Sequence, residues 1–64
     1  MRWWEFIAPN GDHAGYGWGT SRQAETYVVS AGLGTCHACP KDMSDHPLSF
    51  DLAAELEAQR ADEP

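Results

Sequence analysis

Hydrophobic residues dominate positions 2–8, where Trp3, Trp4, Phe6 and Ile7 are side chains that favour β-strands. Because successive side chains of a strand point to opposite faces, we expect Trp4 and Phe6 on one face and Trp3 on the other. The run Pro-Asn-Gly-Asp at residues 9–12 predicts a turn. The pattern therefore predicts an N-terminal strand that ends at a turn.

Glycine and aromatic residues alternate in the next segment, residues 15–19, where Tyr16 and Trp18 lie between glycines. A period of two is typical of a strand, and glycines along one face indicate close approach of another backbone or a bend. This interpretation predicts a hairpin whose tip is near residues 10–11. A glycine-rich loop over residues 11–19 is the competing interpretation.

A helical pattern follows. Thr20 and Gln23 have the spacing of a capping box, in which each side chain accepts a hydrogen bond from the backbone N–H of the other residue. Four apolar residues then recur with the helical period, namely Ala24, Tyr27, Val28 and Ala31. Gly32 is a typical helix stop. The sequence thus predicts a helix from Thr20 to about Ala31.

The last part of the chain predicts a loop and a second helix. Residues 33–39 are short and mixed and could form a third strand that pairs with the hairpin. Residues 40–47 are rich in Pro, Asp and Ser, which favours a loop. Residues 47–61 predict a helix, which Ser44 or Asp45 would cap. Its apolar stripe is formed by leucines at every fourth position: Leu48, Leu52 and Leu56.

These elements predict a single small α+β domain over residues 1–64, frayed at about 62–64, with a two- or three-stranded antiparallel sheet packed against two helices. A chain of 64 residues buries only about 60% of its unfolded surface, which is too little scaffold for a built enzyme pocket. No catalytic motif is present, so we assign no catalytic residue. The lack of a long apolar run or secretory signal predicts a soluble, cytoplasmic protein.

Negative charge is concentrated at one end of the chain. Residues 1–41 contain three acidic and three basic residues, whereas residues 42–64 contain seven acidic residues and Arg60, which gives the whole chain a net charge of −6. Such a surface repels nucleic acid and membranes. It attracts basic protein surfaces and accelerates encounter with them.

The acidic residues of this end are candidates for partner binding. Within a helix over residues 47–61, Asp51 and Glu55 would lie about 6 Å apart on one side. Phosphates along one DNA strand are about 3.4 Å apart in rise, so a row of carboxylates could occupy Lys and Arg sites that normally hold DNA. A solvated face that keeps the protein soluble is the simpler explanation. The full set of candidate acidic residues is Asp42, Asp45, Asp51, Glu55, Glu57 and Asp62.

Tryptophan supplies a second kind of candidate. Three tryptophans are too many for the thin core of so short a chain. We therefore expect Trp3 or Trp18 to be exposed, and exposed tryptophans are frequent anchors in protein interfaces. Trp18 is included in the predicted partner site.

Cys36 and Cys39 have the C-x-x-C spacing of zinc knuckles and of thioredoxin-type redox sites. His46 or His13 could add further zinc ligands. A second paired motif is absent, and so is the βαβ pattern of the redox fold. Two small thiols beside a loop are the simpler interpretation, and we expect neither a metal nor a cofactor. A zinc-binding or redox module that uses Cys36 and Cys39 is the alternative function.

The small size, the acidity and the acidic segment of Asp51, Glu55, Glu57 and Asp62 give the chain a class resemblance to phage anti-CRISPR proteins of the DNA-mimic type. The resemblance implies a non-enzymatic inhibitor that mimics DNA phosphates and blocks a DNA-binding surface of a CRISPR effector complex. The implied partner is a basic nucleic-acid-binding protein, with no direct binding to nucleic acid, and the implied location is the bacterial host cytoplasm. The sequence leaves the oligomeric state open.

Overall fold

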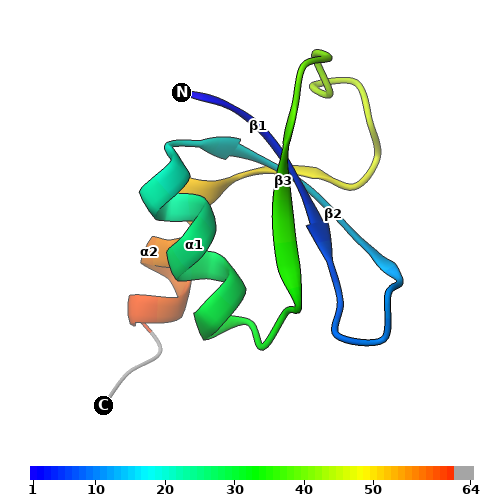
Figure 1. The fold of residues 1–64 in the computed structure, drawn as a ribbon. Coiled ribbons are helices and arrows are strands. Elements are labelled where there is room, and N and C mark those ends of the chain that lie inside the picture. Colours follow the sequence, from blue (N-terminus) through cyan, green and yellow to red (C-terminus); the bar gives the residue numbers. More distant parts are fainter. Residues whose placement is uncertain (62–64) are drawn as a thin grey trace.

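The structure is a computed structural model that describes residues 1–61. Four strands and two helices form an α+β domain, in the order β1 (Arg2–Ile7), β2 (His13–Gly19), α1 (Ser21–Ser30), β3 (Thr35–Cys39), β4 (Ser49–Asp51) and α2 (Leu52–Ala61). The strands form one sheet in the order β3-β1-β2-β4. Figure 1 shows both helices on the same face of this sheet, as the sequence predicted.

The strands β1 and β2 form the predicted hairpin. Trp3 pairs with Trp18, and Glu5 pairs with Tyr16. The connecting turn is closed by the Gly11 N–H, which donates to the Ala8 carbonyl at 2.9 Å. The interpretation of this segment as a strand is therefore confirmed, and the glycine-rich loop is excluded.

Both ends of α1 follow the local signals in the sequence. Thr20 and Gln23 form the reciprocal capping box, with the Gln23 N–H donating to Thr20 Oγ1 at 3.2 Å. At the other end Gly32 adopts a positive φ of 68°, and the Leu33 N–H donates to the Val28 carbonyl at 2.9 Å. This is the Schellman motif that a glycine after the last turn predicts.

The sheet has more strands than the two or three antiparallel strands predicted. β3 pairs antiparallel with β1, which confirms the optional third strand. β4 is a fourth strand and pairs parallel with β2, so the sheet is mixed. β4 was not predicted because it has only three residues, which is too short to show the alternation of apolar and polar residues that identifies a strand.

The second helix begins at Leu52, so the prediction of a helix from residue 47 was wrong in its first turn. Asp51 Oδ1 accepts a hydrogen bond from the Ala53 N–H at 3.0 Å, which is the bond of a helix N-cap. This cap is Asp51, not Ser44 or Asp45. The leucine spacing was misleading because Leu48 lies in the loop and is 52% exposed.

The core lies between the helices and the sheet. Phe6, Ala24 and Leu52 are fully buried, and Phe50 and Tyr27 stack around Phe6 with ring centroids 5.8 and 5.0 Å away. α2 approaches β2 closely because Gly17 has no side chain. A Cβ added to Gly17 would lie 2.8 Å from both Leu52 Cγ and Phe6 Cε2. The close neighbours at Gly17 are side chains, whereas the predicted close approach of another backbone is found at Gly15, where an added Cβ would lie 3.0 Å from the Leu48 carbonyl oxygen.

Candidate functional site

The face of the sheet opposite the helices, which we call the open face, presents polar and aromatic side chains in rows. The strand register fixes these rows, because residues that pair on neighbouring strands share a face. One row is Cys39, Trp3, Trp18 and Asp51, and the next is His37, Glu5, Tyr16 and Ser49. Polar and aromatic side chains from all four strands therefore lie on one surface.

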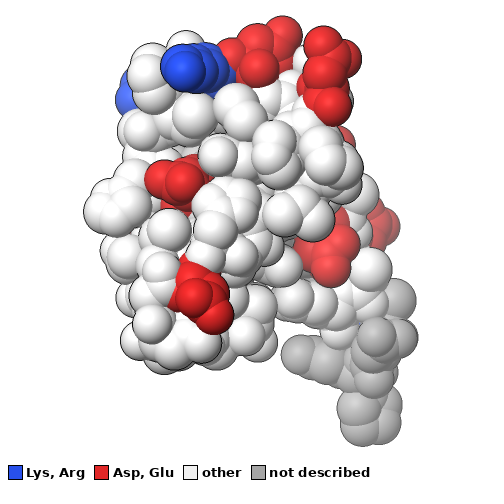
Figure 2. Space-filling model, turned by 90° about the vertical axis from the view of Figure 1, so that its right-hand side faces the viewer, with Lys and Arg blue, Asp and Glu red and all other residues white. Residues whose placement is uncertain are grey.

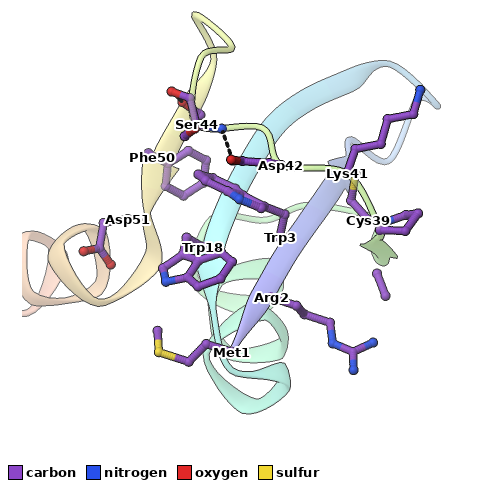
Figure 3. A pocket seen from close by; sticks show the side chains of 13 residues that line it. Met1, Arg2, Trp3, Trp18, Cys39, Lys41, Asp42, Ser44, Phe50 and Asp51 are labelled. Atoms are coloured by element: carbon purple, nitrogen blue, oxygen red, sulfur yellow. Dashed lines mark hydrogen bonds between the residues drawn. The ribbon is translucent and has the colours of Figure 1, made fainter.

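A pocket lies at one end of the open face. β3 and β4 are at opposite edges of the sheet, so the segment 40–48 between them must pass across the ends of β1 and β2. This segment and the first row of side chains line an open pocket of about 930 Å³. We call it the tryptophan pocket; its lining includes Trp3, Trp18, Cys39, Asp42, Ser44 and Asp51 (Figure 3).

Two tryptophan rings form the floor of this pocket. The Trp3 and Trp18 ring centroids are 5.4 Å apart, with the ring planes tilted by 56°. Trp18 is 38% exposed, whereas Trp3 is partly buried beneath its neighbours. The prediction that Trp3 or Trp18 would be exposed is confirmed for Trp18. Trp4 lies on the other face, where its indole N–H donates to the Gly19 carbonyl at 3.1 Å.

Two carboxylates flank the tryptophan pocket. Asp42 Oδ1 accepts the Ser44 N–H at 3.0 Å. Hydrogen bonds from the backbone and side chain of Ser44, and a smaller one from the Trp3 side chain, lower the pKa of the Asp42 carboxyl below its ordinary value. Asp51 lies opposite Trp18 in the register and caps α2. Both aspartates are thus held in place by backbone N–H groups rather than by cations.

Arg2 and Lys41 also line the tryptophan pocket, but among the described residues neither forms an ion pair with Asp42 or Asp51. The Arg2 guanidinium lies 5.9 Å from the centre of the Trp4 ring. Figure 3 shows the charged ends of Arg2 and Lys41 directed away from the two stacked tryptophans. Among the described side chains the ion pair found joins His13 Nε2 to Glu5 Oε2 at 3.6 Å, with no Lys or Arg involved.

Three other predicted acidic residues that the structure describes, Asp45, Glu55 and Glu57, do not line the pocket. Glu55 and Glu57 are two residues apart on α2, about 200° around the helix, so they point to opposite sides. The Glu55 carboxylate adds to burial in raising the pKa of Tyr27. Glu57 lines a shallow hollow with Gln23 of α1. Asp45 is exposed in the loop, and Asp62 lies outside the described residues.

The acidic surface is therefore divided. Figure 2 shows acidic side chains as separate clusters with uncharged surface between them, and basic side chains beside acidic ones at one end. The sequence-based row of Asp51, Glu55 and Asp62 assumed that Asp51 lies inside the helix. Asp51 instead ends β4 and lies beside Trp18, so it is grouped with Asp42 at the tryptophan pocket.

The two cysteines are separated by strand geometry. Residues three apart in a strand point to opposite faces and have Cα atoms about 10 Å apart, too far for a disulfide. Cys36 pairs with Phe6 on the core side, and Cys39 pairs with Trp3 on the open face. Burial, followed by repulsion from Glu25, raises the pKa of the Cys36 thiol. The C-x-x-C spacing therefore does not bring the thiols together.

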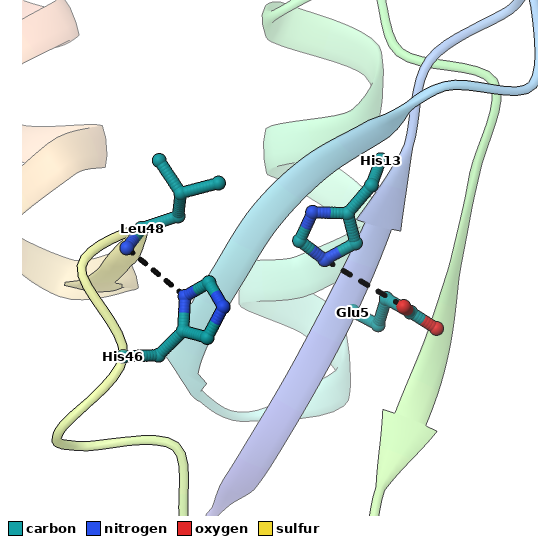
Figure 4. Close-up of polar contacts among 4 residues, drawn as sticks. All are labelled: Glu5, His13, His46 and Leu48. Carbon is teal, nitrogen blue, oxygen red and sulfur yellow. Dashed lines mark hydrogen bonds and ion pairs between the residues drawn. The ribbon is translucent and has the colours of Figure 1, made fainter.

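Sequence analysis did not identify a second aromatic and polar cluster on the open face. The Tyr16 ring packs against the rings of His13 and His46, with centroids 4.6 and 4.7 Å away. The two histidine rings also face each other, with centroids 6.2 Å apart (Figure 4). His46 Nδ1 accepts the Leu48 N–H at 3.0 Å and so shapes the loop before β4. Within residues 1–61 no three His, Cys, Asp or Glu side chains are arranged to hold a metal ion. His46 therefore has a structural partner, and it does not meet Cys36 and Cys39 at a zinc site.

Neither of the helices described is long and apolar enough to cross a membrane. Comparisons of the chain with known protein families, with curated proteins and with solved structures found no match. Function is therefore inferred from the geometry of the open face.

Proposed function

We propose that this chain is a non-enzymatic binding protein that docks the open face of its sheet on a basic surface of a partner protein. One observation supports this most directly: Asp42 and Asp51 line an open aromatic pocket, and neither forms an ion pair with Arg2 or Lys41, which line the same pocket. Exposed tryptophan with adjacent carboxylates matches the cationic and amphipathic side chains of a basic protein.

In its specific form the proposal is an inhibitor of the anti-CRISPR, DNA-mimic type. The partner would be a nucleic-acid-binding protein or a CRISPR effector complex, and the carboxylates would occupy Lys and Arg sites that otherwise hold DNA. The net charge of −6 favours fast encounter with such a surface. The tryptophan pocket would supply the buried contacts that slow dissociation.

Affinity capture from a bacterial lysate at low and high salt tests this function. We expect a nucleic-acid-binding protein to be retained at low salt, released at high salt and displaced by duplex DNA. Retention of no basic protein, or retention that DNA does not affect, would contradict the proposal.

A matched pair of double variants tests whether the open face is the surface used. Asp42→Asn with Asp51→Asn removes two charges at the tryptophan pocket, and Glu55→Gln with Glu57→Gln removes two charges from α2. We expect the first pair to lose most of the captured partner and the second to keep most of it. Equal losses would mean that net charge alone directs binding.

The arrangement of the two cysteines does not favour the zinc or redox alternative. Its chemistry needs both thiols at one point, whereas Cys36 and Cys39 occupy opposite faces of β3.

A further inference from the structure

We infer that the tryptophan pocket is a receptor for one guanidinium group, that of an arginine side chain on the partner. The inference rests on the proposed function and adds the chemistry of its central contact. It begins from the shape of the pocket: two tilted indole rings at the base and one carboxylate from each of two different elements, the crossing loop and the end of β4.

The aromatic base favours a cation with a flat, weakly hydrated face. The ring face of a tryptophan attracts a cation within about 6 Å of its centre, and it does so better than tyrosine or phenylalanine. A guanidinium is planar and stacks on such a ring, whereas an ammonium is compact and strongly hydrated. Trp18, the more exposed of the two rings, is available for this stacking.

The carboxylates favour a cation with several N–H donors. Asp51 lines the pocket and uses Oδ1 to cap α2, while its Oδ2 accepts no hydrogen bond from the described residues. Asp42 is held on the other element by Ser44 and is kept ionised by its hydrogen bonds. The five N–H donors of a guanidinium form a planar fork that can pair with a carboxylate through parallel N–H···O bonds. A quaternary ammonium has no N–H and would add no hydrogen bond to either carboxylate.

Titration of the ¹⁵N-labelled protein with small probes tests the inference directly. The three tryptophans give three indole N–H signals, of which Trp4 is an internal reference because it donates to the Gly19 carbonyl. The probes are N-acetylarginine amide, N-acetyllysine amide, N-acetylcitrulline amide and tetramethylammonium, at one ionic strength. Citrulline has nearly the shape of arginine without its charge.

We expect N-acetylarginine amide to shift the Trp3 and Trp18 signals, with Kd on the order of 1 mM for a single side chain, and to leave Trp4 unchanged. The lysine probe should bind at least about fivefold more weakly, because it lacks the planar fork. Citrulline should cause no saturable shift. Saturable shifts with citrulline, or tighter binding of lysine or tetramethylammonium than of arginine, would overturn the inference.

Two variants separate charge from structure. Asp51→Asn keeps a helix-capping side chain and loses the charge, since Asn caps about as well as Asp. Glu57→Gln loses a charge on the far side of α2. We expect Asp51→Asn to weaken arginine binding at least about threefold, and Glu57→Gln to leave it unchanged. Equal weakening in both would show that the probe responds to net charge and would overturn the assignment to the pocket.

The two proposals fail in different ways. If the protein captures a basic partner that DNA displaces but N-acetylarginine amide does not move the Trp18 signal, the guanidinium site is wrong and the proposed function stands. If arginine binds at the pocket but no basic partner is captured, the site stands and the proposed function is wrong.

Discussion

The two faces of the sheet use the same strands in opposite ways. In β2 the residues toward the helices are Gly15, Gly17 and Gly19, whereas Tyr16 and Trp18 point to the open face. On the face toward the helices, the lack of a side chain at the glycines leaves room for Leu52 and Phe6 to pack against β2. The open face retains large side chains, of which Trp18 is exposed while Tyr16 packs against His13 and His46. Strand alternation thus separates residues that stabilise the fold from residues free to bind.

This separation has a cost in so small a chain. The core contains three fully buried residues, Phe6, Ala24 and Leu52, and the partly buried residues around them do most of the remaining packing. Stability in domains of this size is a few kcal/mol. A change on the covered face should therefore affect folding strongly, and a change on the open face should affect binding first.

The largest expected effect is at Leu52, which is fully buried against Gly17 and Gly19. Leu52→Ala removes core contacts and leaves a cavity, and we expect a loss of about 2–5 kcal/mol in the free energy of unfolding. Urea denaturation followed by tryptophan fluorescence measures it. At the upper end of this range the variant would be largely unfolded without denaturant.

Leu48→Ala is the matched control for this substitution. The sequence places Leu48 and Leu52 on one helical stripe, but Leu48 is 52% exposed in the loop before β4. We expect a change below about 1 kcal/mol. Similar losses for Leu48→Ala and Leu52→Ala would restore the longer helix and contradict the comparison of the two faces.

Elements that depend on neighbouring residues were predicted correctly, whereas an element that depends on pairing with a distant strand was not. α1 was predicted with both ends because Thr20, Gln23 and Gly32 act within a few residues of the backbone groups that they satisfy. The start of α2 was wrong because Ser49 and Phe50 become a strand only by pairing with β2, more than thirty residues earlier. Leucine spacing is a local signal and cannot report that pairing.

The second effect concerns the close approach at Gly17. A methyl group there would lie 2.8 Å from Leu52 Cγ, so Gly17→Ala must displace α2 or Phe6. We expect a loss of about 1–3 kcal/mol from overpacking. Combining Gly17→Ala with Leu52→Ala should cost less than the sum of the single changes. The shorter side chain at position 52 relieves the clash, and the added methyl group at position 17 fills part of the cavity. Additive costs would show that the two residues are not in contact.

The third effect is on the open face. Trp18→Ala removes one ring of the Trp3–Trp18 pair from a position that is 38% exposed. We expect at most about 1.5 kcal/mol of destabilisation, the scale of an aromatic pair, together with loss of partner capture. Circular dichroism and denaturation report the first quantity, and capture from lysate reports the second. A loss as large as that of Leu52→Ala would mean that the open face is part of the core.

The site was predictable in its parts and not in its assembly. The thin core indicated an exposed tryptophan, and charge segregation indicated Asp42 and Asp51. Their meeting depends on strand order, because the loop reaches Trp18 only by crossing from β3 at one edge to β4 at the other. Cys36 and Cys39 lie apart because both are in the extended strand β3, and C-x-x-C spacing brings thiols together only where the chain turns.

The smallest effect concerns pH and lies at Tyr27, on the covered face. Burial, and secondarily the Glu55 carboxylate, raise the pKa of Tyr27 above its ordinary value near 10. The folded state therefore holds the phenol proton more tightly than the unfolded state does. The stabilisation is complete below pH of about 10 and is lost as the pH rises through the folded-state pKa. Tyr27→Phe should flatten this alkaline decline, Glu55→Gln should make it smaller by bringing the folded-state pKa of Tyr27 closer to its unfolded-state value, and Tyr16→Phe on the open face should retain it. An unchanged alkaline decline in Tyr27→Phe, measured by denaturation between pH 8 and 11.5, would show that the covered face does not perturb this phenol.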